Sequence, residues 1–69
     1  MIKCNLAELM AKKKIRIADV IRDTGIPRGT LTRLYNETVI RVDLNDVDKL
    51  CHYFDCEISD LFEFHRKQE

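Results

Sequence analysis

Apolar residues recur at steps of three and four along most of the chain, which is the spacing of one face of an α-helix. The first stripe predicts a helix over about residues 6–13, with Asn5 as its N-cap. A second stripe predicts a helix over about residues 17–24, and Gly25 is expected to end it in the left-handed conformation. The pattern therefore favours helices from the first residues onward.

A third helix is predicted after a connection of about three residues centred on Gly25. Pro27 suits its first turn, because a residue there needs no partner for its N–H group. Leu31, Leu34 and Tyr35 are spaced i, i+3, i+4 and are expected to face inward. The same helical period leaves the following residues facing outward: Gly29, Thr32, Arg33 and Asn36, with Arg28 projecting from the first turn.

Two further helices complete the pattern. Residues 37–43 are predicted to form a loop, Asp43 can cap a fourth helix, and Ser59 can cap a short fifth one. Five short helices without repeat or linker indicate an all-α fold, a compact five-helix bundle in one domain, residues 1–64, with a charged tail at 65–69. The tight connection between the second and third helices is typical of a helix-turn-helix, here at about residues 17–36.

The length and composition of the chain limit the kinds of function that it can have. A chain of 69 residues has little room for a large active site, so we expect that it is not an enzyme. Apolar residues make up 45% and charged residues 35%, which fits a folded, water-soluble domain. Apolar runs are too short for a signal peptide or a membrane span, so we expect a cytoplasmic protein with no membrane contact.

Charge is distributed unevenly although the net charge is zero. Residues 1–41 hold nine Lys/Arg against four Asp/Glu, whereas residues 42–69 hold three against eight. A neutral chain is a poor candidate for coating nucleic acid without sequence preference. A dipolar one can present its basic side to an anionic partner and leave its acidic side to solvent or to another partner.

The run IADVIRDTGIPRGTLTRLYN, residues 17–36, resembles the helix-turn-helix of the Cro/CI-type repressor family, also called the XRE family. The flanking segments NLAELMAKK and VDLNDVDKLCHYFDCEISDLFEF resemble the first, fourth and fifth helices of its small stand-alone members. The resemblance implies a lambda-repressor-like DNA-binding fold, a bacterial or phage transcription regulator, a third helix in the DNA major groove, and dimerisation. The residues that carry the match are Val20, Gly25, Ile26, Leu31, Leu34 and Asn36.

Candidate DNA contacts follow from the outer face of the third helix and from the resemblance. Arginine pairs in bidentate fashion with guanine, and Arg28 and Arg33 match positions at which family members contact bases. Thr30 and Thr32 can bond bases or phosphates, and Gly29 would allow a close backbone approach. Contacts to the DNA backbone are expected from Arg16, which matches a phosphate-contacting position, and from Asn36, Arg41, Lys12 and Lys14.

Simpler interpretations accompany these residues. An exposed helical arginine is usually a solvated charge, and the lysines at 12–14 more often form a solvated helix end than a phosphate site. Cys4, Cys51 and Cys56 are an odd set, which favours free thiols over disulfides. Cys51 is expected to face inward and His52 outward, so we predict packed cysteines, no metal site and no cofactor.

The sequence as a whole favours a sequence-specific DNA-binding regulator, a repressor acting as a homodimer on double-stranded DNA, with no small-molecule effector evident. Candidate dimer contacts are the apolar side chains of Ile40, Tyr53, Phe62 and Phe64, for which covering the core is the other interpretation. The rival function is a protein-interaction module of antitoxin or anti-repressor type on the same fold, binding a partner through its acidic C-terminal half.

Overall fold

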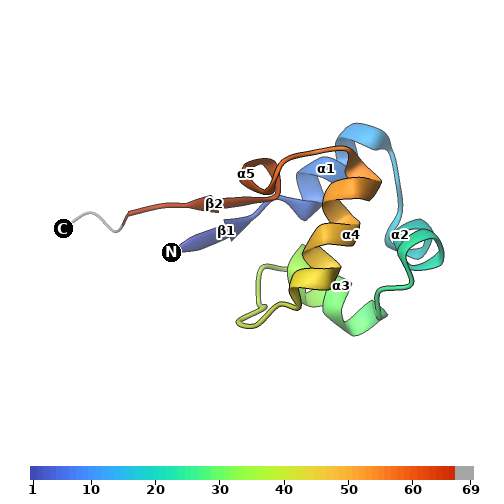
Figure 1. Cartoon of the computed structure of the whole chain (residues 1–69), viewed down its shortest axis with the longest axis horizontal. Coiled ribbons are helices and arrows are strands. Elements are labelled where there is room, and N and C mark those ends of the chain that lie inside the picture. Colours follow the sequence, from blue (N-terminus) through green and yellow to red (C-terminus); the bar gives the residue numbers. More distant parts are fainter. Residues whose placement is uncertain (67–69) are drawn as a thin grey trace.

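The computed structural model describes residues 1–66, and its five helices confirm the predicted helical bundle (Figure 1). The helices are α1 Leu6–Lys13, α2 Ile17–Thr24, α3 Arg28–Tyr35, α4 Leu44–Phe54 and α5 Ile58–Leu61. Two short strands, β1 Ile2–Cys4 and β2 Phe62–Phe64, pair antiparallel and were not predicted. This ribbon joins the two ends of the chain and projects beyond the helices.

The core draws apolar side chains from every helix. Leu31 and Leu34 of α3 are fully buried, as their spacing predicted, and so is Ile26 in the connection before α3. Removing one such side chain from water stabilises the fold by about 2 kcal/mol. The other buried core residues are Cys4, Leu6, Met10, Val20, Val47, Leu50, Phe54 and Leu61.

The predicted helix caps fared differently. Asp43 caps α4 as expected, because its Oδ1 accepts the Asn45 N–H at 2.8 Å. Asn5 is the N-cap residue of α1, as predicted, but its side chain makes no capping bond; its amide instead donates to Glu63 Oε2 at 2.7 Å. The cap at Ser59 is wrong, because α5 already begins at Ile58, one residue before it.

Four helices are followed by a residue in the left-handed conformation, and at three of them this residue is not glycine. At Lys14, Glu37 and Asp55 φ is 55°, 59° and 51°, and the next residue's N–H reaches back to the helix. The bonds run from Ile15 to Met10 O at 3.0 Å, from Thr38 to Arg33 O at 2.9 Å and from Cys56 to Cys51 O at 3.0 Å. This is the Schellman motif, which places Cys51 and Cys56 together as half-buried free thiols. Gly25 ends α2 with φ 75°, as predicted.

The ribbon is held to the bundle at its base. Cys4 is buried in the core, and its N–H donates to Glu37 Oε1 in the α3–α4 loop at 3.1 Å. Ile2 lies opposite Phe64, Lys3 opposite Glu63 and Cys4 opposite Phe62. The charged tail predicted at 65–69 begins with His65, which is bonded to the ribbon because its N–H donates to Met1 O at 2.8 Å. Residues 67–69 of that tail lie outside the described residues.

Candidate nucleic-acid interface

The connection between α2 and α3 is fixed from inside the molecule. The Thr24 hydroxyl donates to Val20 O at 2.6 Å and accepts the Ile26 N–H at 3.2 Å. Ile26 is fully buried, so this connection is held to the core and cannot swing freely. The two helices therefore form a rigid helix-turn-helix that sets the direction in which α3 faces.

The outer face of α3 carries the side chains that the helical period predicted. Arg28, Gly29, Thr32 and Arg33 are exposed, and Thr30 is half-buried. A Cβ added at Gly29 would lie 3.6 Å from Nη1 of Arg33, so the Arg33 guanidinium extends back over the glycine. The face thus combines two guanidinium groups, a hydroxyl and a patch of bare backbone.

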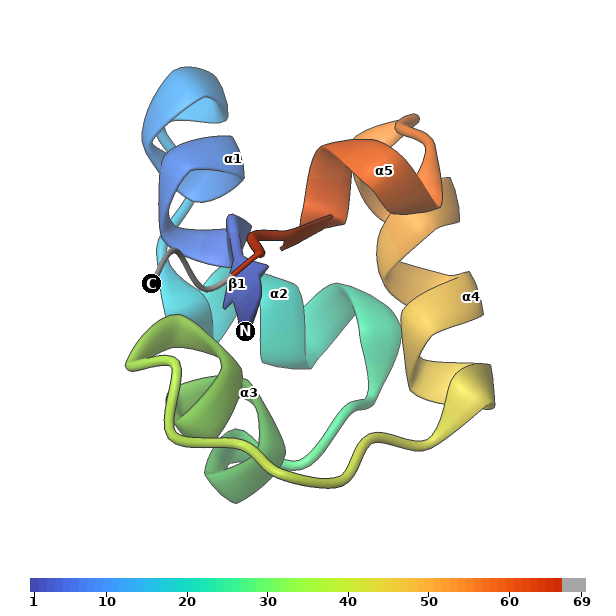
Figure 2. The same ribbon diagram turned by 90° about the vertical axis from the view of Figure 1, so that its left-hand side faces the viewer.

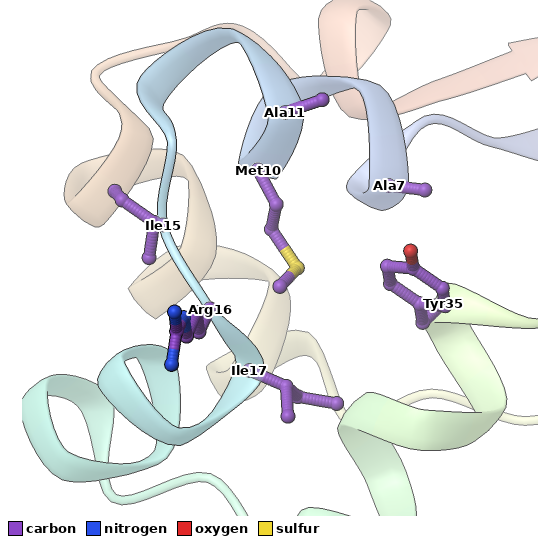
Figure 3. A pocket seen from close by; sticks show the side chains of 7 residues that line it. All are labelled: Ala7, Met10, Ala11, Ile15, Arg16, Ile17 and Tyr35. Carbon is purple, nitrogen blue, oxygen red and sulfur yellow. The ribbon is translucent and has the colours of Figure 1, made fainter.

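Tyr35 at the end of α3 corrects one expectation. It was predicted to face inward, but its side chain is 46% exposed. Tyr35 instead borders an open depression where α1, the start of α2 and the end of α3 meet (Figure 3). Arg16 lies on the same depression, and the remaining lining residues are apolar: Ala7, Met10, Ala11, Ile15 and Ile17.

Acidic side chains of α2 are neutralised within the molecule. Arg22 bridges Asp19 at 3.1 Å and Asp23 at 2.9 Å, and the Tyr53 hydroxyl donates to Asp23 at 2.7 Å. The Arg22 hydrogen bond, followed by that of Tyr53, holds the pKa of Asp23 below its usual value. The bond to Asp23 in turn raises the pKa of Tyr53.

The basic residues predicted to contact DNA differ from these acidic residues in their ion pairing. Within residues 1–66, no salt bridge joins a carboxylate to Arg16, Arg28, Arg33 or Arg41, nor to Lys12 or Lys14. All six side chains are exposed. Their charges are therefore available to an anionic partner without first breaking an ion pair.

Not all of these residues lie together. Arg16 is the N-cap of α2, where Asp19 Oδ2 accepts its N–H at 3.1 Å, and it shares the depression with Tyr35 of α3. Asn36 is exposed at the end of α3, and Arg41 is exposed in the α3–α4 loop. Figures 1 and 2 place the end of α1, which carries Lys12 and leads into Lys14, at the opposite end of the molecule from α3.

The four apolar residues predicted as dimer contacts differ in how exposed they are. Ile40 is 94% and Phe64 68% exposed, whereas Phe62 and Tyr53 are half-buried against the core. Sequence reasoning missed Ile2, which is 62% exposed and lies directly opposite Phe64. Its only sequence signal was the alternation of apolar residues at 2 and 4, too short a pattern to indicate a strand.

Other chemistry is sparse in the part of the chain that the structure describes. Residues 1–66 hold no group of three or more potential metal ligands. Burial raises the pKa of the Cys4 and Cys56 thiols, which makes them poor nucleophiles. Among the same residues, no helix has the length and apolar character needed to cross a membrane.

Comparison with models of protein families matches residues 5–67 with a model described as a Cro/C1-type HTH DNA-binding domain. The match covers almost the whole chain, including all five helices and β2. A comparison with curated proteins gives no match.

Proposed function

Because the chain belongs to the Cro/C1-type helix-turn-helix DNA-binding family, we propose that it is a sequence-specific transcription regulator that reads the major groove with α3. The observation that carries the proposal is that Arg28 and Arg33, both exposed on α3, form no salt bridge with a carboxylate of residues 1–66. A helix fits the major groove, which is about 12 Å wide.

In this proposal the two arginines read guanine O6 and N7, and each correct pairing contributes about 1–3 kcal/mol of discrimination. Thr32 offers a hydroxyl donor or acceptor and a methyl group for thymine. Gly29 lets the α3 backbone approach the DNA closely, and Thr30, half-buried beside it, is better placed for a phosphate or sugar contact than for deep insertion.

Phosphate contacts flank the reading helix. Arg16 at the start of α2 lies on the depression that Tyr35 borders, and Asn36 follows Tyr35 at the end of α3; both are exposed and can bind the DNA backbone. Arg41 in the following loop extends this set. Lys12 and Lys14 are left out of the proposed interface, because they lie at the far end of the molecule from α3.

The proposed protein acts in the cytoplasm by binding alone, without catalysis, cofactor or small-molecule effector. A homodimer would place two α3 helices on half-sites about 34 Å apart along the DNA. Occupying such a site at a promoter would exclude the transcription machinery, which makes repression the simplest outcome.

Binding of fluorescently labelled DNA from upstream of the protein's own gene tests the reading role, with unrelated DNA as the reference. We expect preference for the upstream fragment, affinity that falls with salt, and a loss of about 100-fold for the Arg28→Ala/Arg33→Ala variant. The Lys13→Ala/Lys49→Ala variant is the matched control, since it removes the same charge from α1 and α4 and should stay within a few-fold of wild type.

Equal binding by wild type and the α3 variant would refute the reading role. Such a result would favour the rival function, a protein-interaction module that uses the acidic half of the chain. Charge reversal at Asp43, Asp48 and Asp60, all exposed, would then abolish partner binding and leave DNA unaffected.

A further inference from the structure

The turn that follows α4 brings two cysteines together. Cys51 lies near the end of α4, and Cys56 follows Asp55, whose φ of 51° reverses the chain. The Cys56 N–H donates to Cys51 O at 3.0 Å, and standard bond lengths then hold the two Cα atoms at most about 7 Å apart. A disulfide needs Cα atoms no further apart than about 7 Å and side chains that point toward each other. The backbone of this turn meets the first condition.

The two side chains also meet the second condition. Residues at these two positions of a Schellman motif frequently pack against each other. The same positions carry Met10 and Ile15 after α1, but after α4 they carry two thiols. Cys51 and Cys56 are both half-buried against the core. The pKa of Cys56 is raised first by burial and next by the Cys51 thiol, so the two sulfur atoms are neighbours.

Cys56 can be reached from solvent. It lies on an open groove between α1 and the segment that joins α4 to α5. The charged side chains that line this groove are two lysines and four carboxylates: Lys3, Lys12, Glu8, Asp55, Asp60 and Glu63. An excess of negative charge favours the entry of an uncharged small molecule over an anionic one such as glutathione disulfide.

We propose that Cys51 and Cys56 form a reversible disulfide that closes the end of α4, with a small uncharged disulfide as the oxidant. Cys56 loses its proton and attacks one sulfur of the oxidant, which leaves a mixed disulfide on Cys56 and releases one small thiol. Cys51 then loses its proton and attacks the Cys56 sulfur, which releases the second small thiol. The two protein thiols thus lose two protons and two electrons, and the oxidant gains them.

This pair follows the redox state of its surroundings slowly. The thiolate is the attacking species, and the raised pKa keeps the Cys56 thiol protonated at neutral pH. The equilibrium nevertheless favours the disulfide, because the folded chain already holds the two thiols side by side. By thermodynamic linkage, the disulfide stabilises the fold by the same factor by which folding favours the disulfide.

The inference goes beyond the proposed function and is independent of it. Figures 1 and 2 place the last turn of α4 at the end of that helix that is farther from α3. Closing this turn leaves Arg28 and Arg33 unchanged, so the oxidised and reduced proteins should bind DNA with affinities within about twofold of each other. Failure of the disulfide to form would leave the reading role of α3 intact, and the reverse also holds.

Equilibration of the full chain with 2-mercaptoethanol and its uncharged disulfide tests the proposal. Free thiols are then alkylated with N-ethylmaleimide in denaturant and counted by mass spectrometry. The three cysteines of wild type should give three adducts when reduced and a single adduct, at Cys4, when oxidised. The ratio of small thiol to small disulfide at half-oxidation gives the effective concentration of one protein thiol at the other.

The matched control is Cys56→Ala/Glu57→Cys, which keeps three cysteines but moves one of them a residue beyond the turn bond. Glu57 is exposed, so circular dichroism should show the control folded. Its effective concentration should be at least about tenfold below that of wild type, and wild type in concentrated urea should show a similar loss.

Thermal unfolding gives an independent measurement. Oxidised wild type should melt about 4 °C or more above the reduced protein, because the cross-link restricts the unfolded chain. Equal effective concentrations in wild type and control, a disulfide that includes Cys4, cross-links mainly between chains, or a lower melting temperature after oxidation would overturn the proposal.

Discussion

The helix-turn-helix and the ribbon are held in place in opposite ways. Ile26, Leu31 and Leu34 anchor α3 and its preceding turn from inside, and all three are fully buried. The ribbon is anchored at Cys4, while Ile2 and Phe64 further out are mostly exposed, and the backbone bonds there join their neighbours Met1 and His65. The first region therefore fixes the position of an exposed, charged helix face, whereas the second exposes apolar side chains at the edge of a ribbon.

The largest expected effect is a difference in the free energy of unfolding between a core variant and a ribbon variant. Leu31→Ala should destabilise the fold by about 2–5 kcal/mol, because it leaves a cavity in the core. Phe64→Ala should change the stability of the monomer by less than about 1 kcal/mol, because its ring is mostly in solvent. Urea unfolding at a concentration below dimerisation compares the two, and an equal loss in both would show that the ribbon is part of the cooperative core.

Two substitutions at helix ends should change the stability of the fold in opposite directions. Asp55→Gly should stabilise by about 1 kcal/mol, because glycine adopts the left-handed conformation without the steric cost that an aspartate bears. Gly25→Ala should destabilise by about 1 kcal/mol for the same reason. Apart from Gly25 and its two neighbours in the chain, no residue lies within 4 Å of the added Cβ, so the effect reports backbone conformation. Thermal unfolding of both variants measures it, and shifts of the same sign would contradict this account.

The smallest expected effect is a pH dependence at the α2–α4 contact. The pKa of Asp23 is lowered in the fold, first by Arg22 and then by Tyr53, so its contribution is present above the unfolded pKa, about 4. That contribution is lost as the pH falls through the lower folded value. Tyr53→Phe should reduce the melting temperature slightly at pH 7 and leave it unchanged well below the folded pKa of Asp23. A difference that persists in acid would assign the effect to the hydrogen bond of the hydroxyl, which a protonated carboxyl can still accept, and not to the charge of Asp23.

The helices could be predicted because each carries its own apolar period, and the outward positions of α3 followed from the same geometry. Asp43 was predicted as a cap because its partner, Asn45, is two residues away. The Asn5 side chain makes no capping bond because its amide binds Glu63, a residue 58 positions along the chain. Pairings of that kind leave no local pattern, and the strands IKC and FEF are too short to alternate visibly.

Part of the candidate site could also be predicted, because it depends on the local geometry of one helix and not on contacts between distant residues. The exposure of Arg28, Gly29, Thr32 and Arg33 depends on one helix and could be predicted from its period. The separation of Lys12 and Lys14 from α3 depends on how three helices pack, which a charge count cannot show. Tyr35 was misplaced because its spacing puts it at the border of the apolar face, where the depression leaves it open.

The central claim is that α3 is the helix that meets DNA. Amide chemical shifts of ¹⁵N-labelled protein, titrated with the DNA fragment from upstream of its gene, test it most directly. The account predicts that DNA shifts the amides of residues 28–36 and of the start of α2 most strongly. DNA-induced shifts centred on α4 and α5, with α3 unchanged, would contradict it.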